Sequence, residues 1–189
     1  MDSYNVKTMK AAIVLVLLAA SVLLFASPPV VSCPCDHARP ETLAARVCSL
    51  CKEAEAHSTE FFFLKDINPH KPHRYLALPK AHDRELQAVG TMGADERERY
   101  WRAAIAEAEK LYPGGWGLAS NGYLFRTQCH AHLHMGPLSP EVEDTGGAIY
   151  ADPKDFPHTG PDQGVWVHPK DGRYCLHLDR ALAEVVLER

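Results

Sequence analysis

Three histidines alternate with apolar residues near the middle of the chain, in the segment His-Ala-His-Leu-His-Met at residues 130–135. Alternate side chains of a β-strand point to the same face of the sheet. On a strand, the imidazoles of His130, His132 and His134 would therefore line one face, and the apolar residues between them would face the core. The spacing predicts a polar site built on one strand.

Two kinds of chemistry fit three imidazoles on one face. Neutral imidazoles are metal ligands, although the first acidic residue after His134 is Glu141, beyond Gly136 and Pro137. A neutral imidazole is also a good nucleophile near pH 7 and can attack a phosphoryl group. A purely structural cluster is less favoured, because three polar rings on one face would all need partners. The residues alone leave metal binding and phosphoryl chemistry open.

The surrounding pattern predicts an α+β domain on an antiparallel sheet, because strands, a helix and further strands follow one another. Turn residues join the first two strands and also the last two. The predicted elements are a short helix at 41–57, strands at 61–64 and 74–78, the main helix at 95–111, strands at 116–120 and 128–135 around a turn at Asn121-Gly122, a loop at 139–164, and a final hairpin of strands at 165–168 and 174–178.

The N-terminal segment carries an uninterrupted apolar run at residues 11–26, preceded by Lys7 and Lys10 and followed by Ser27-Pro28-Pro29. This order is typical of an export signal or a short membrane anchor. Residues 1–32 are therefore predicted to be a signal peptide or N-terminal anchor, and residues 33–189 the catalytic domain. We expect the protein to be exported, in the periplasm or at the outer face of the inner membrane. Residues 30–33 also resemble a lipoprotein cleavage box ending at Cys33.

Six cysteines are compatible with an oxidising compartment. The spacing of Cys48 and Cys51 fits half of a zinc site, but export favours a structural disulfide near the N-terminus. The cysteines are Cys33, Cys35, Cys48, Cys51, Cys129 and Cys175.

Composition and charge restrict the function further. The 189 residues are 46% hydrophobic and 23% charged, which suits one globular domain with a core. The net charge of −4 argues against binding to nucleic acid, which needs a basic face.

Two segments together resemble the histidine-triad superfamily, whose members attack the α-phosphate of nucleotide conjugates. Residues 130–135 resemble the triad itself. Residues 66–82 are similar to the other signature of the superfamily: an Asp that holds the ribose, a turn with proline, and a strand that ends in Pro79-Lys80. The resemblance covers most of residues 48–136 and implies a HIT-like sheet with one main helix between the two segments.

Within that superfamily, Leu118-Ala119-Ser120-Asn121 followed by the run Arg-Thr-Gln-Cys-His at residues 126–130 most resembles the CDP-diacylglycerol pyrophosphatase branch. The segment 64–68 and the apolar N-terminus are similar to the same branch. The resemblance implies hydrolysis of CDP-diacylglycerol to CMP and phosphatidate. The alternatives are an exported hydrolase of other nucleoside diphosphate conjugates, or an exported metal-binding protein that uses the triad with Cys48 and Cys51.

The resemblance also implies roles for individual residues. His132 would form a phosphohistidine intermediate, while His130 and His134 orient it and donate hydrogen bonds to the substrate. No metal or cofactor is implied, because the triad supplies both the nucleophile and charge stabilisation. Proteins of this superfamily are often homodimers. The residues expected to bind substrate are Asp66, Asn121, Arg126, Thr127 and Gln128, while His73, His168 and His177 are expected to be structural or surface histidines.

Overall fold

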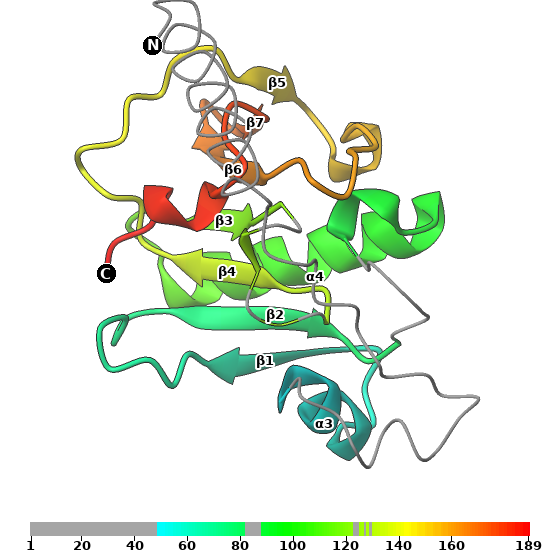
Figure 1. Ribbon diagram of the computed structural model, residues 1–189. Coiled ribbons are helices and arrows are strands. Elements are labelled where there is room, and N and C mark those ends of the chain that lie inside the picture. Colours follow the sequence, from blue (N-terminus) through cyan, green and yellow to red (C-terminus); the bar gives the residue numbers. More distant parts are fainter. Residues whose placement is uncertain (1–48, 82–87, 123–124, 127, 129) are drawn as a thin grey trace, which may run out of the picture. The chain divides into compact units, whose positions relative to one another are not determined.

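The computed structural model describes residues 49–81, 88–122, 125–126, 128 and 130–189, which form an α+β fold on one seven-stranded sheet (Figure 1). The strand order is β1-β2-β4-β3-β6-β7-β5, and every neighbouring pair is antiparallel. The strands are β1 (Phe61–Lys65), β2 (Tyr75–Pro79), β3 (Gly117–Ser120), β4 (Leu133–Gly136), β5 (Ala148–Tyr150), β6 (Val165–Lys170) and β7 (Arg173–His177). The helices are α3 (Ser49–Ala56) and α4 (Ala94–Leu111), with short 3-10 turns η1 (Val89–Thr91), η3 (Pro153–Asp155) and η4 (Ala183–Val186). The predicted α+β class is confirmed.

Both predicted hairpins are present. Strands β1 and β2 pair along their full length, from Phe61 opposite Pro79 to Lys65 opposite Tyr75. Strands β6 and β7 are joined by Asp171 and Gly172, whose φ angles are 50° and 70°. Positive φ at both central residues is the geometry of the tight turn that matches the twist of two antiparallel strands.

Helix α4 covers one face of the sheet and matches the predicted main helix within one residue (Figure 1). Its buried side chains recur at helical spacing and pack on Ala77, Leu118, Leu133 and Met135 of the central strands. The fully buried Tyr100 also donates its hydroxyl to the carbonyl of Ala77, at 2.6 Å. The helix therefore fixes β2 in position by packing and by a hydrogen bond.

The opposite face of the sheet is covered at two separate places. Helix α3 packs through Leu50 and Cys51 on Leu76 and Leu78 of β2. The turn η4 packs through residues 183–187 on Ala119 of β3 and Trp166 of β6. Strand β4 lies between these two covers, so its side chains on this face can line a recess.

Three sequence expectations differ from the structure. Strand β4 begins at Leu133 and not at residue 128, and its pairing with β2 ends at Ala77 opposite Leu133. Further along β2, the carbonyl of Pro79 is hydrogen-bonded to the ring of His130 and not to a backbone nitrogen of a continuing strand. Strand β3 ends at Ser120 and β4 begins only at Leu133, so the two are not joined by a tight turn at Asn121-Gly122. The predicted loop at 139–164 contains β5, which pairs with the outer edge of β7.

Several expectations fall on residues outside the described ranges. These include the signal or anchor at residues 1–32, the first part of the helix predicted at 41–57, and Cys33, Cys35, Cys48 and Cys129 with their predicted disulfide. Among the described residues, no helix combines the length and apolar character needed to span a membrane.

The side chain of Arg74 ties the C-terminal segment to the sheet. It is only 2% exposed, and its guanidinium donates to the carboxylate of Glu184 at 2.8 Å. It also donates to the backbone carbonyls of Glu184, Leu187 and Glu188, at 3.0, 2.6 and 2.6 Å. The five N–H donors of an arginine can serve these four acceptors at once, whereas a lysine has only three.

We expect Arg74→Met to lower the free energy of unfolding by about 3 kcal/mol, because it leaves buried acceptors without a donor. The control is Arg99→Met, which removes an equivalent ion pair with Glu60 on the surface, where both side chains are 53% exposed. The control should be almost unchanged in urea unfolding followed by tryptophan fluorescence. Equal effects of the two substitutions would contradict the role given to Arg74.

Candidate active site

A pocket of about 510 Å³ opens on the sheet face opposite α4, between α3, the β1–β2 connection and η4. The structure brings most of the predicted site residues into its lining. These are Asp66, Asn121, Arg126, Gln128, His132 and His134. Lys71 and Glu184 line the same pocket and were not predicted. Thr127 lies outside the described residues.

His132 lies just before β4 and is 5% exposed. Its Nδ1 is 2.7 Å from the backbone carbonyl of His130. A carbonyl only accepts hydrogen bonds, so Nδ1 carries the proton and Nε2 of the neutral ring keeps its lone pair. Burial lowers the pKa of His132 to about 4, with a smaller contribution from the charge of Arg126, so the ring is neutral at pH 7. His132 thus has the tautomer and charge that a nucleophile needs.

His134 lies on β4, where it is opposite Leu76 on one side and Ala119 on the other. Its ring stands edge-on to that of His132, with the centroids 4.9 Å apart. Its Nδ1 is 3.6 Å from a carboxylate oxygen of Glu184. Burial and the neighbouring His132 lower the pKa of His134, against the opposing pull of Glu184. His134 connects the nucleophile candidate to the C-terminal segment.

His130 lies behind the pocket and does not line it. Its Nε2 is 2.6 Å from the carbonyl of Pro79, at the end of β2. Its Nδ1 is 3.9 Å from the thiol of Cys51 on α3. In this position His130 accepts a hydrogen bond from His132 through its backbone carbonyl. A direct hydrogen bond from His130 to a substrate remains a prediction.

Glu184, like Lys71, is a charged residue of the pocket that was not predicted from the sequence. Its carboxylate accepts hydrogen bonds from Lys71 at 2.5 Å, from Arg74 and from the side-chain amide of Asn121. Its backbone nitrogen donates to Oδ1 of Asn121. Burial alone would raise its pKa, but His134, Lys71 and Asn121 outweigh that effect and hold the pKa at about 2. No motif after residue 140 marks this position, so only the fold identifies it.

The other polar residues of the pocket already have local partners. Asp66 accepts a hydrogen bond from the backbone nitrogen of Asn68 at 2.9 Å, which shapes the turn after β1. Gln128 accepts from the hydroxyl of Ser49 at 3.4 Å. The amide of Asn121 is committed to Glu184, so its predicted contact with a phosphate would require exchange of that partner.

The triad does not have the arrangement of a three-nitrogen metal site. Both ring nitrogens of His130 already face other groups: Nε2 the carbonyl of Pro79 and Nδ1 the thiol of Cys51. Among the described residues, the group of potential ligands whose atoms converge contains no member of the triad. The geometry therefore favours the nucleophilic interpretation of the triad over metal binding.

Comparisons with known proteins give a partial likeness among the solved structures. Neither the protein-family models nor the curated proteins contain a match to this chain. Among solved structures, the chain is similar to a HIT family hydrolase from Clostridium thermocellum, with 24% sequence identity and a TM-score of 0.41. The aligned region covers 51% of this chain and 95% of that protein.

Proposed function

We propose that this protein hydrolyses the diphosphate bond of a nucleotide conjugate, with His132 as the nucleophile. The observation that carries the proposal is the state of that ring: neutral, with Nδ1 held by a carbonyl, in the wall of a pocket. A neutral imidazole with a free lone pair attacks phosphorus, whereas an imidazolium does not. The same pocket offers Lys71 and Arg126 as cations for the phosphate oxygens.

The reaction would proceed in two displacements. First, Nε2 of His132 attacks the α-phosphorus, a nitrogen–phosphorus bond forms, and the bond from that phosphorus to the bridging oxygen breaks. The leaving phosphate departs with the bonding electron pair. In the second step water attacks the phosphohistidine, the nitrogen–phosphorus bond breaks, and the water proton is released as the nucleoside monophosphate forms. His132 then returns to its neutral state.

Charge balance in the pocket suits an anionic substrate. Glu184 and Asp66 are also in the lining, but the carboxylate of Glu184 is engaged by Lys71 and Arg74 together. The close ion pair between Lys71 and Glu184 orients the ammonium group toward the pocket. Placement of cations before substrate arrives reduces the reorganisation needed in the transition state.

His132→Ala should reduce turnover of nucleotide diphosphate conjugates by at least about a thousandfold, because the nucleophile is lost. Rapid quenching of the wild-type protein with an α-labelled substrate should trap a phosphorylated histidine that maps to residue 132. The control His73→Ala changes an exposed histidine outside the pocket and should retain activity. Full activity of His132→Ala would rule out the mechanism.

The rate should also stay constant to unusually low pH. Protonation of His132 removes the attacking lone pair, and its pKa is about 4, so kcat/KM should fall only near pH 4 and not near 6.5. A UDP-sugar is a suitable substrate because neither its diphosphate nor its uracil ring titrates in that range. An acid limb with a midpoint between pH 6 and 7 would contradict this assignment.

The pH experiment needs a control for unfolding, because the protonation of His132 also changes the stability of the fold. The pKa of His132 is lower in the folded state than in the unfolded chain, so the unfolded chain binds the proton first as the pH falls below 6.5. This group therefore removes stability between about pH 6.5 and 4. Near-UV circular dichroism at each pH separates loss of the fold from protonation of the nucleophile.

We propose CDP-diacylglycerol as the substrate, cleaved to CMP and phosphatidate. Two apolar side chains at the pocket support a lipid-linked conjugate: Ile67 is 95% exposed and Phe125 is 49% exposed. Exposed large apolar side chains beside a polar pocket are typical of a surface that contacts an apolar ligand. An exported, membrane-anchored protein, as expected from residues 1–32, would meet such a substrate in the bilayer.

The double variant Ile67→Ser/Phe125→Ser should raise KM for CDP-diacylglycerol about tenfold or more, because each apolar side chain contributes by burial against the acyl chains. Turnover of ADP-ribose by the same variant should change less than twofold. If both substrates are affected equally, the two side chains contact the nucleotide or support the fold. If only ADP-ribose and similar soluble conjugates are cleaved by the wild-type protein, the substrate is a soluble nucleoside diphosphate conjugate instead.

A further inference from the structure

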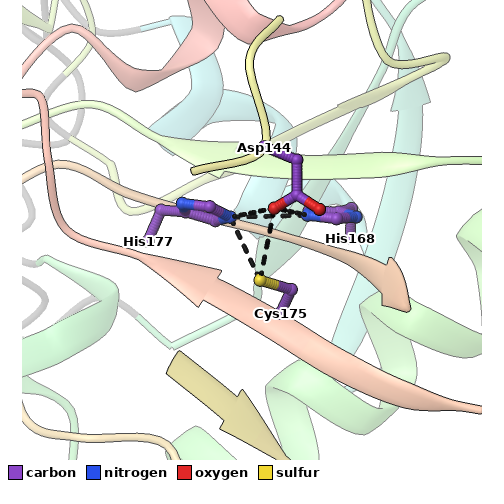
Figure 2. A group of neighbouring side chains, drawn as sticks. All are labelled: Asp144, His168, Cys175 and His177. Atoms are coloured by element: carbon purple, nitrogen blue, oxygen red, sulfur yellow. Dashed lines mark hydrogen bonds and ion pairs between the residues drawn. The ribbon is translucent and has the colours of Figure 1, made fainter. Parts of the chain in front are cut away.

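A second group of polar side chains lies apart from the pocket, at the β6–β7 hairpin (Figure 2). His168 and Cys175 are directly opposite each other across the two strands, and His177 is two residues further along β7. Asp144 approaches from the segment between β4 and β5. From the sequence, His168 and His177 are expected to be structural or surface residues, but the fold turns them toward one point.

The four ligand atoms all lie within 4.8 Å of one another, and five of their six mutual distances are close to those of a coordination shell. Oδ1 of Asp144 is 3.2 Å from Nε2 of His168 and 3.2 Å from Nε2 of His177. The thiol of Cys175 is 3.5 Å from Oδ1 of Asp144 and 3.2 Å from Nε2 of His177. The two Nε2 atoms are 3.4 Å apart. A tetrahedral Zn²⁺ with bonds of about 2.0–2.3 Å places its ligand atoms roughly 3.3–3.6 Å apart.

The tautomer of His168 directs a lone pair into this group. Nδ1 of His168 lies 3.0 Å from the carbonyl of Pro169 and must donate to it, so Nε2 of the neutral ring carries the lone pair. That lone pair faces Oδ1 of Asp144 at 3.2 Å and Nε2 of His177 at 3.4 Å. A bound cation would be coordinated by this lone pair and by the carboxylate oxygen together.

Residues around the group hold its ligand atoms in place. The ammonium of Lys170 binds Oδ2 of Asp144 at 2.5 Å and leaves Oδ1 directed inward. The ring of Trp166 stacks on His177 with 3.6 Å between centroids and 8° between planes. Such outer contacts orient the ligands of metal sites.

Gly147 forms the wall of the group on the side of β5. A Cβ at this position would lie 2.4 Å from the thiol of Cys175 and 2.5 Å from Nε2 of His177. Any side chain there would fill the space between the ligand atoms. Glycine is the residue that leaves this space open.

We propose that Asp144, His168, Cys175 and His177 bind one Zn²⁺ ion in a tetrahedral site. The donor set of two imidazoles, one thiolate and one carboxylate suits zinc, and on binding the thiol proton of Cys175 passes to solvent. Four protein ligands complete the coordination, so the ion is structural and attaches the segment around Asp144 to the hairpin. This inference does not depend on the proposed function.

The test uses the full chain purified in detergent, without a histidine tag, and equilibrated with Zn²⁺. Wild-type protein should hold one zinc ion through this group. Asp144→Asn and His177→Asn should each weaken zinc binding, measured by competition with a chelating dye, by about a hundredfold or more. The control His73→Asn, at an exposed position, should bind zinc as the wild type does. Wild-type affinity in both ligand variants would overturn the proposal.

Cobalt distinguishes this site from any other that the chain contains. Co²⁺ in the proposed site should give the intense visible bands of tetrahedral coordination and a near-ultraviolet band from one thiolate. Cys175→Ser should lose the thiolate band. Gly147→Ala keeps all four ligands but fills the space, and should also lose cobalt binding while circular dichroism shows a retained fold. A thiolate band that persists in Cys175→Ser would place the metal elsewhere and refute the assignment.

Discussion

The carboxylate of Glu184 joins parts of the chain that are far apart in sequence. Lys71 and Arg74 come from the β1–β2 hairpin, Asn121 from the end of β3, and His134 from β4. A half-buried carboxylate is stable in such a place only when cations and donors surround it. The pair of cations serves this purpose, and in return the carboxylate keeps Lys71 beside the pocket. The site is complete only when the C-terminal turn η4 docks on the sheet.

Burial acts on the imidazoles in the direction that nucleophilic chemistry requires. A histidine in water is partly protonated near pH 6.5, but His132 has lost most of its contact with solvent and remains neutral. Its proton is placed on Nδ1 by a backbone carbonyl that His130 supplies. His130 is in turn held by the carbonyl of Pro79. The contact with Pro79 thus holds the ring of His130, and the backbone carbonyl of His130 in turn positions the ring of His132.

Local patterns in the sequence were sufficient for the parts of the fold that depend on neighbouring residues. The apolar spacing of α4 and the Asp171-Gly172 turn each predict their element, because helical periodicity and positive φ are local properties. The alternation of the triad is also a local property, whereas Asp66, Asn121, Arg126 and Gln128 were expected from the resemblance of two segments to a known superfamily. Glu184 was not predicted, because its role depends on a contact with Arg74, which is more than a hundred residues away in the chain. The group around Cys175 was missed because strand register, and not a motif, brings its members together.

The two polar groups share one face of the sheet, and the register places them in one row. His134 is opposite Ala119, Ala119 is opposite Trp166, and Trp166 is opposite His177. Three strand spacings separate the ends of this row by about 14 Å, too far for direct contact. Trp166 occupies the middle, stacked on His177 and packed in the same cluster as Ala183 and Val186 of η4. A ligand that orders His177 would therefore act on the surface on which η4 rests, and η4 carries the carboxylate of Glu184 beside His134.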